Sequence, residues 1–427
     1  MMLRLPALIP LLWLFARGLC PGEEPLNSLQ DPTGTLTRAQ ALALADTHNP
    51  ELRTAQWSVQ AAEGIILQAA AVPNPALSLE AENFGGRGAQ KRFDAAEYTA
   101  QVEQTFELGG KRDKRKRVAH AEAQLAGLDR EAVRLDTRAE TIRRFVGVLG
   151  AQAQVELARE AVSLAEAVAR TTATRVETGK VSSMEQEKAE MILAQKMIDR
   201  DQARQVLATA RTQLAAQWGR SEPAFAAAVD DLTTVPTLPP LPDLLRRLHG
   251  NPDLARWSCE QERARAILVQ EQASRLPDLS VAAGVRRANE TDACTLVAGV
   301  TVPLPLFDQN QGKIREAEAR LAMAEQQQRA AEAKAAAGLT STYQQLVTAT
   351  NRVAAWKSTV LPRARAVFET TQTGYAQGKF SYLELLDAQR TLVEARAIYI
   401  DALTAVHTGA ADLERIIGLQ LPAQAQK

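Results

Sequence analysis

The chain contains nearly the same series of short motifs twice, and this internal repeat limits what it can fold into. Asn49-Pro50-Glu51-Leu52 returns as Asn251-Pro252-Asp253-Leu254, and 251 − 49 gives an offset of 202 residues. The other matching pairs are Pro75-Ala76-Leu77-Ser78-Leu79 with Pro277-Asp278-Leu279-Ser280-Val281, Gly110-Lys111-Arg112 with Gly312-Lys313-Ile314-Arg315, and Thr178-Gly179-Lys180 with Gln377-Gly378-Lys379. Two copies with so few gaps indicate one structural unit of about 200 residues that is used twice.

Each copy combines long helices with a short two-stranded hairpin. In the first copy, apolar residues spaced three or four apart predict one helix from Leu36 to Ala71, capped by Thr37. Two runs of alternating apolar and polar residues, near 75–84 and 98–106, then predict a hairpin. The copy ends with predicted helices from Lys111 to about Glu177 and from Ser182 to Trp218. The second copy predicts helices over 241–273, 313–375 (kinked at Pro362) and 382–417, and strands near 279–286 and 295–302.

The helix lengths indicate an elongated molecule. The helix that begins at Lys111 has about 65 residues, which at a rise of ~1.5 Å per residue spans ~100 Å. The two shorter helices of the copy, stacked end to end, reach about the same length. We therefore expect a rod or the wall of a tube, with repeats over 36–219 (strands at 75–107) and 241–418 (strands at 278–303). The Pro-rich segment in 220–240 predicts a structured crossover, and 419–427 form a tail.

The N-terminus predicts export. Arg4 precedes a short apolar run from Leu5 to Ala16, and small residues follow, so 1–20 is typical of a signal peptide. Cys20 leaves lipid attachment as an alternative, although Leu19 is larger than the residue that usually precedes a lipidated cysteine. No later segment is apolar enough for a transmembrane helix. The net charge is zero, so no overall field would recruit nucleic acid.

The predicted hairpins have the length and alternation of outer-membrane strands. Their apolar faces carry residues such as Leu79 and Val102, and their polar faces carry Glu80, Glu82 and Glu103, which we expect to line a water-filled lumen. Four strands cannot close a barrel, and open edges are not tolerated in lipid. Two chains would give an eight-stranded barrel and three a twelve-stranded barrel, and only the larger leaves a lumen for acidic side chains.

These motifs, in this order and in both copies, resemble the TolC-like outer-membrane efflux protein family. The segment from Glu97 to Arg112, with Val72-Pro73-Asn74-Pro75 and the Leu77–Glu80 strand, is most similar to its CzcC-like heavy-metal branch. The resemblance implies a mostly α fold with a membrane β-barrel portion. Each of three chains would give four of twelve strands in the outer membrane and long helical hairpins to a periplasmic tunnel. It further implies docking to a periplasmic adaptor and an inner-membrane RND pump.

Two helix-to-helix turns are candidate docking sites. The glycines supply a positive φ at a helix end, and the serines can cap the helix that follows. In the family that the chain resembles, these turns form the periplasmic tip that meets the adaptor. Their residues are Gly179, Lys180 and Ser182 in the first copy and Gly378, Lys379 and Ser381 in the second.

Glu384 and Asp387 are the candidate aperture residues. They lie three positions apart, so they share one helix face beside the second turn. In related channels the matching acids project into the narrow end of the tunnel, where three copies would form carboxylate rings that favour cations. A solvated helix face is the alternative. The first copy has Glu185, Glu187 and Lys188 instead, so the two copies are not equivalent here.

Other residues support no chemistry of their own. The basic run from Lys111 to Arg117 follows a membrane strand, so we expect it to contact lipid phosphates or solvent. His48, His120, His249 and His407 are scattered, and no catalytic group, cofactor site or metal site is predicted.

The leading hypothesis is a passive exit duct of a tripartite efflux system, carrying heavy-metal cations through the outer membrane. Efflux of drugs or other organic compounds and type I protein secretion are alternatives within the same class of channel. An exported coiled-coil scaffold in the periplasm is a distant one, because it leaves the two hairpins unexplained.

Overall fold

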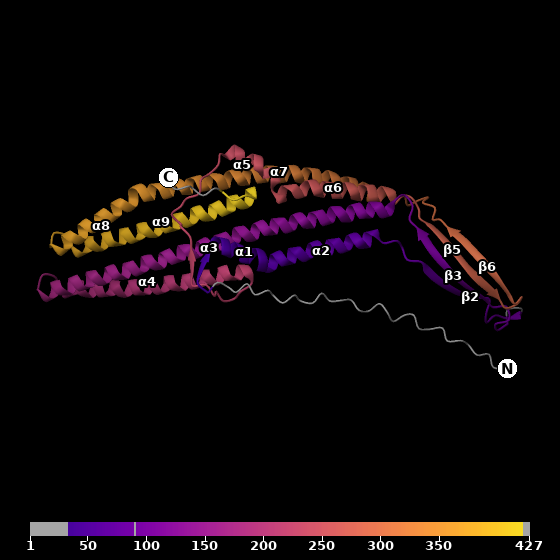
Figure 1. Cartoon of the computed structure of the whole chain (residues 1–427), viewed down its shortest axis with the longest axis horizontal. Coiled ribbons are helices and arrows are strands. Elements are labelled where there is room, and N and C mark those ends of the chain that lie inside the picture. The colour runs from indigo at the N-terminus through magenta and orange to yellow at the C-terminus, as the bar shows by residue number, and fades with distance from the viewer. Residues whose placement is uncertain (1–32, 89–90, 422–427) are drawn as a thin grey trace.

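The computed structural model describes residues 33–88 and 91–421. The expected signal peptide, Cys20 and the end of the tail at 422–427 lie outside the described residues. Over the described part, the chain is a long rod of helices with a narrow sheet at one end (Figure 1).

Long helices form the rod, as the sequence predicts. The longest, α3, has 67 residues and begins and ends where predicted, which corresponds to ~100 Å of helix. It packs along α2 and α4, and also contacts α6 and α9. The helices of the described residues are α1 (Arg38–His48), α2 (Pro50–Ala70), α3 (Lys111–Glu177), α4 (Ser183–Ala215), α5 (Leu241–Arg247), α6 (Pro252–Ala273), α7 (Gln311–Ala355), α8 (Leu361–Ala376) and α9 (Tyr382–Ile417).

The predicted single helices over 36–71 and 241–273 are wrong, because each is broken at an Asn-Pro pair. Asn49 and Asn251 have extended backbones, as residues before proline usually do, and each caps the next helix with its side-chain oxygen. Their amide groups donate to the carbonyls of Gln217 (2.8 Å) and Ile416 (2.6 Å). Asn49 therefore ties the start of α2 to the 3₁₀ turn that follows α4, and Asn251 ties the start of α6 to the end of α9.

The predicted kink at Pro362 takes the form of a π-helical turn within a continuous helical rod. A π-helical turn over Trp356–Val360 separates α7 from α8, and Pro362 lies in the first turn of α8. Proline has no N–H to continue an α-helical ladder, and π turns are a known response to such a lost hydrogen bond. The rod formed by α7 and α8 bends at this π turn (Figure 1).

The core is distributed along the rod in separate clusters. One surrounds Phe145, Leu214 and Trp218, where α1, α3 and α4 meet. A second joins α5, α7 and α9, and a third lies among α8, α9 and the adjoining parts of α3 and α4. The expected crossover is structured. Its β4 (Ala227–Val229) pairs in parallel with β1 (Thr35–Thr37), a two-stranded sheet that the sequence did not predict.

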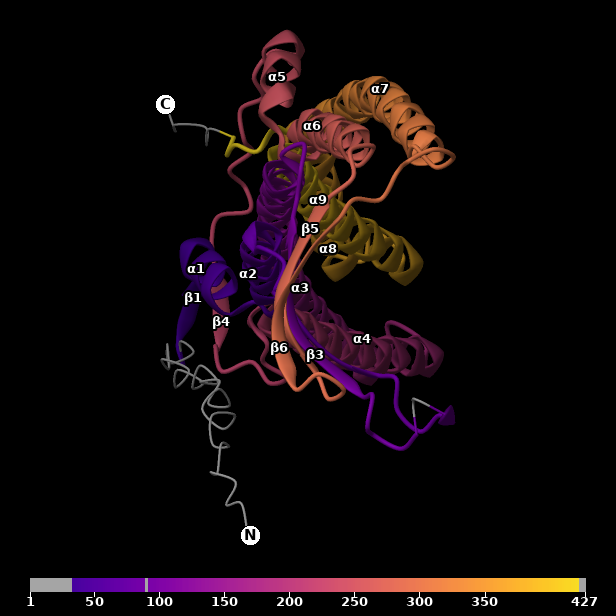
Figure 2. The same cartoon turned by 90° about the vertical axis from the view of Figure 1, so that its right-hand side faces the viewer.

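The four long strands form one antiparallel sheet in the order β2-β3-β5-β6. Their bounds are β2 (Ala76–Glu82), β3 (Glu97–Phe106), β5 (Leu279–Ala288) and β6 (Ala293–Thr301). The β3–β5 pairing joins the hairpins of the two repeats, so β2 and β6 are the outer strands. Figure 2, which views the chain from the sheet end, shows the strands as a narrow curved strip in front of the helices.

Candidate functional site

The two helix-to-helix turns lie together at the end of the rod opposite the sheet (Figure 1). They have the same geometry. Gly179 (φ 67°) and Gly378 (φ 78°) are left-handed, and their N–H groups donate to the carbonyls of Val176 and Tyr375. The next N–H groups, of Lys180 and Lys379, donate to the carbonyls five residues earlier, both at 2.8 Å. Ser182 and Ser381 cap α4 and α9, as predicted.

An arginine that the sequence did not single out connects the two turns. Arg175 of α3 donates to the Tyr375 carbonyl at 2.8 Å, and its guanidinium lies 4.5 Å from the centre of the Tyr375 ring. The Tyr375 hydroxyl is 3.1 Å from the hydroxyl of Thr172. Burial raises the pKa of the neighbouring Tyr382 to about 12. The tips of the two repeats therefore form one packed unit.

Glu384 and Asp387 lie on the exposed side of α9, but neither carboxylate is free. Glu384 accepts from the Ser381 N–H at 2.7 Å and from its hydroxyl at 2.8 Å. These bonds, the backbone bond first, lower the pKa of Glu384 below its ordinary value. Asp387 pairs with Arg390 at 3.3 Å, and Arg390 also reaches Glu394 at 3.7 Å. The face therefore carries a positive charge among its acids, which an acid-only interpretation missed.

A groove of about 490 Å³ runs beside this face, between α4 and α9. Asp387, Arg390 and Glu394 line it from α9, and Lys196 lines it from α4. Leu383, in the first turn of α9, is 67% exposed and adds an apolar surface. The second repeat thus presents a mixed charged and apolar wall just beyond its turn.

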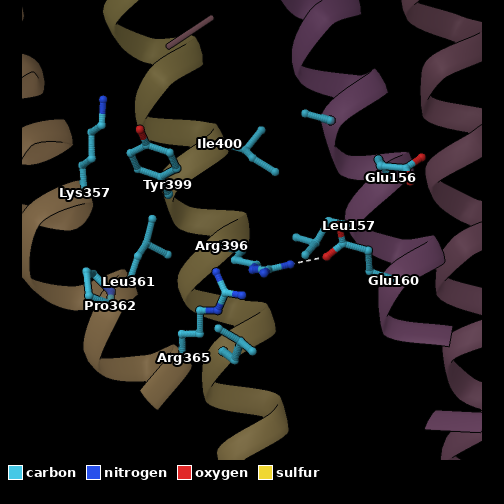
Figure 3. A pocket seen from close by; sticks show the side chains of 12 residues that line it. Glu156, Leu157, Glu160, Lys357, Leu361, Pro362, Arg365, Arg396, Tyr399 and Ile400 are labelled. Atoms are coloured by element: carbon cyan, nitrogen blue, oxygen red, sulfur yellow. Dashed lines mark hydrogen bonds and ion pairs between the residues drawn. The ribbon is translucent and has the colours of Figure 1, made fainter. Parts of the chain in front are cut away.

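A second groove, of about 660 Å³, lies further along the rod between α3 and the α8–α9 hairpin. Figure 3 shows Arg396 of α9 paired with Glu160 of α3 across it. Lys357, from the π turn, and Arg365 lie on the α8 side. The sequence could not predict this groove, because its residues come from both repeats.

The polar face of the sheet gathers the acidic residues that were predicted to line a lumen. The register places Glu80 opposite Thr99, Glu82 opposite Glu97, and Glu103 opposite Ala76. Directly opposite residues share one face, so all these side chains lie on the same side. Glu97 and Arg286 also belong to this face, and the sequence analysis missed both.

Part of the basic run at the start of α3 contacts the protein itself, while Arg112 and Arg117 are exposed to solvent. Lys111 pairs with Asp278 at 2.7 Å, Arg115 pairs with Glu107, and Arg112 donates to the Ala70 carbonyl at 2.7 Å. These contacts fix the junction between the sheet and the helices.

Within residues 33–88 and 91–421, no three His, Cys, Asp or Glu side chains are grouped so that they could hold a metal ion. In the same part of the chain, no helix has both the length and the apolar character needed to cross a bilayer.

Comparison with known proteins identifies the family. A sequence profile described as outer membrane efflux protein matches residues 41–220 and 245–419. The chain belongs to the outer membrane efflux protein family. The cobalt-zinc-cadmium resistance protein CzcC of Cupriavidus metallidurans is 35% identical to this efflux protein over 390 residues, which cover 91% of each chain. The nickel and cobalt resistance protein CnrC of the same organism is 30% identical over 67% of this chain and 66% of its own.

Solved structures share the fold of this efflux protein. CusC aligns with a TM-score of 0.77 at 18% identity, covering 90% of this chain and 92% of its own. The MtrE outer membrane channel of Neisseria gonorrhoeae aligns with a TM-score of 0.73 at 17% identity, covering 91% of each chain. The predicted family and fold class are confirmed, and the protein is an outer-membrane efflux protein.

Proposed function

We propose that three copies of this efflux protein form a passive exit duct for divalent heavy-metal cations. The observation that carries the proposal is the four-stranded sheet, which is apolar on one face, acidic on the other, and open at β2 and β6. Unpaired strand edges are not tolerated in lipid, so β6 of one copy must pair with β2 of the next. Three copies give a twelve-stranded barrel with room for water beside the carboxylates.

Metal cations are the proposed cargo for two reasons. The relatives CzcC and CnrC are named for resistance to cobalt, zinc, cadmium and nickel. The inner face of the sheet carries Glu80, Glu82, Glu97 and Glu103, and rings of carboxylates favour cations in channels. The cargo would pass these side chains without a dedicated binding site.

The tip turns are the proposed contact with a periplasmic adaptor, which would in turn hold an inner-membrane RND pump. The glycine and lysine of each turn are exposed at the end of the rod furthest from the sheet. Glu384 and Asp387 follow directly, so we place them at the periplasmic aperture. The repeats at 36–219 and 241–418, with the crossover at 220–240, are the units of the proposed duct.

Light scattering of the detergent-purified protein and tolerance assays in a strain that lacks it test this function. A trimer whose expression restores tolerance to cobalt, zinc or cadmium supports the proposal. Restored tolerance to organic compounds, or restored protein secretion, without metal tolerance would favour the other cargoes. A monomer that stays monodisperse without detergent would support the periplasmic scaffold and overturn the duct.

The docking role has a separate test in Gly378→Pro. This change removes the left-handed conformation and the N–H that donates to Tyr375, so it should abolish export. Trimers should remain, because the turn is far from the sheet. Unchanged cross-linking of this variant to the adaptor would contradict the docking role.

A further inference from the structure

We propose that Arg286 is a specificity-determining residue of the duct, a tethered positive charge that prevents two exit carboxylates from retaining the cations that pass. The inference rests on the proposed function, since it takes the acidic face of the sheet as the lumen. It concerns the end of the sheet furthest from the helices, where β2 ends and β3 begins (Figure 1).

The charges of the sheet are divided unequally between its two faces. The strands carry six charged side chains, and the register places five of them on one face. These five are Glu80, Glu82, Glu97, Glu103 and Arg286. Arg287 lies on the opposite, apolar face, where it pairs with Asp292 at 2.9 Å. Arg286 is therefore the one positive charge that these strands present to the lumen.

Arg286 lies where two of the carboxylates are forced together. Glu82 and Glu97 are directly opposite each other on neighbouring strands, an arrangement in which like charges repel. The Arg286 guanidinium reaches Glu97 at 3.2 Å and Glu82 at 3.8 Å. Its Nε also donates to the Thr99 hydroxyl at 3.0 Å, and Thr99 is only 5% exposed. The side chain is thus held from three directions by residues of both β2 and β3.

Without Arg286, this place would offer two carboxylates and a hydroxyl, which are oxygen ligands that divalent cations accept. Conduction requires that such binding be weak enough for the ion to leave. A guanidinium stays protonated throughout the physiological range, so Arg286 reduces the charge of the group from −2 to −1 permanently. Glu80 and Glu103, which have no such partner among the described strand residues, keep the rest of the lumen attractive to cations.

The test compares the full-length wild type with Arg286→Gln and Arg287→Gln in planar bilayers. Arg287→Gln is the matched control, because it removes the same charge from the adjacent residue on the other face. Arg286→Gln should make the channel more cation-selective, so its reversal potential in a KCl gradient should move toward the equilibrium potential of K⁺. It should also be blocked by roughly tenfold less Zn²⁺, the scale expected for one close unit charge that acts through water in the lumen. Arg286→Lys should keep the wild-type selectivity.

Three results separate the possible failures. A wild type that forms no conducting channel would refute the proposed function itself. A conducting wild type with an unchanged Arg286→Gln reversal potential and Zn²⁺ block would overturn only the role of Arg286. If Arg286→Gln does not assemble, the double variant with Glu82→Gln and Glu97→Gln is measured in its place. That double variant should become less cation-selective, and an unchanged reversal potential would overturn the inference.

Discussion

The two β-hairpins lie side by side in one sheet, yet they resemble each other on only one of its two faces. On the apolar face, Leu79, Ala100, Val285 and Leu296 form a single row across all four strands. On the other face, β2 and β3 carry four carboxylates, whereas β5 and β6 carry small residues and Arg286. Lipid demands an apolar surface from both repeats, while water accepts many side chains. The lining of the duct has therefore been free to differ between the repeats.

The helical ends show the opposite pattern, because both repeats keep the same capping residues. Each left-handed glycine satisfies the last carbonyls of its helix, and each Asn-Pro pair satisfies the first N–H groups of the next one. These demands come from the backbone and do not depend on what the surface faces. The repeats agree where backbone groups need partners and differ where side chains meet water.

The largest expected effect tests the shared apolar face. Leu79 and Leu296 lie in one row that crosses both hairpins. Leu79→Arg and Leu296→Arg should therefore each cost about 2–4 kcal/mol of stability in the membrane. Glu80→Arg, on the inner face, should cost much less. The yield of folded protein in outer-membrane fractions measures this. Equal yields for Leu79→Arg and Glu80→Arg would break the assignment of faces.

The next effect tests why the second hairpin uses small residues. A Cβ on Gly284 would lie 2.3 Å from the Ala100 carbonyl, whereas one on Gly299 would meet nothing within 4 Å. Gly284→Ala should therefore destabilise the sheet by about 1–3 kcal/mol, the usual cost of overpacking. Gly299→Ala should change the thermal stability in detergent little. A thermal unfolding midpoint for Gly284→Ala equal to that of Gly299→Ala would show that the strands move apart to accept the methyl group without losing stability.

A smaller effect tests whether the two Asn-Pro pairs are equivalent. Asn49→Ala and Asn251→Ala should each cost about 0.5–2 kcal/mol through loss of the cap. Asn49→Asp and Asn251→Asp keep the capping oxygen but lose the donor to Gln217 or Ile416, so they separate the two roles. Denaturant unfolding measures all four variants. A large difference between the repeats would contradict the equivalence.

The smallest expected effect is a pH dependence at the tip of the second repeat. Because the folded state lowers the pKa of Glu384, its contribution is present above the ordinary value of 4.5 and is lost as pH falls through the folded pKa. Hydrogen-exchange protection in the first turn of α9 should therefore weaken below about pH 4.5. Glu384→Gln should remove that dependence. A Glu384→Gln variant that keeps the wild-type pH profile would assign the change to another group.

Most of the architecture was predictable because its signals are local. The 67 residues of α3, the glycine turns and the alternation of both hairpins follow from neighbours in sequence. The breaks at Asn49 and Asn251 were missed although the repeated Asn-Pro pair signals them, since a pre-proline residue disfavours the helical conformation. Arg175 and Arg286 were missed for a different reason, because each acquires its role from partners about 200 residues away in the chain. Arg390 was missed although its partners, Asp387 and Glu394, lie three and four positions away on the same helix.

The sequence by itself determined the repeat, the rod-like helices and the two-faced strands, because periodicity and capping act over a few residues. Only the tertiary structure decided that β3 pairs with β5, and with it which charges meet. That pairing places Arg286 against Glu97 and Glu82, 189 and 204 residues away (286 − 97 and 286 − 82). A register shift of one residue would turn Arg286 toward lipid and Arg287 toward the lumen. The alternation of Leu279, Val281 and Val285 already assigns Arg286 to the polar face, but only packing across the sheet sets the register that brings it to Glu97 and Glu82.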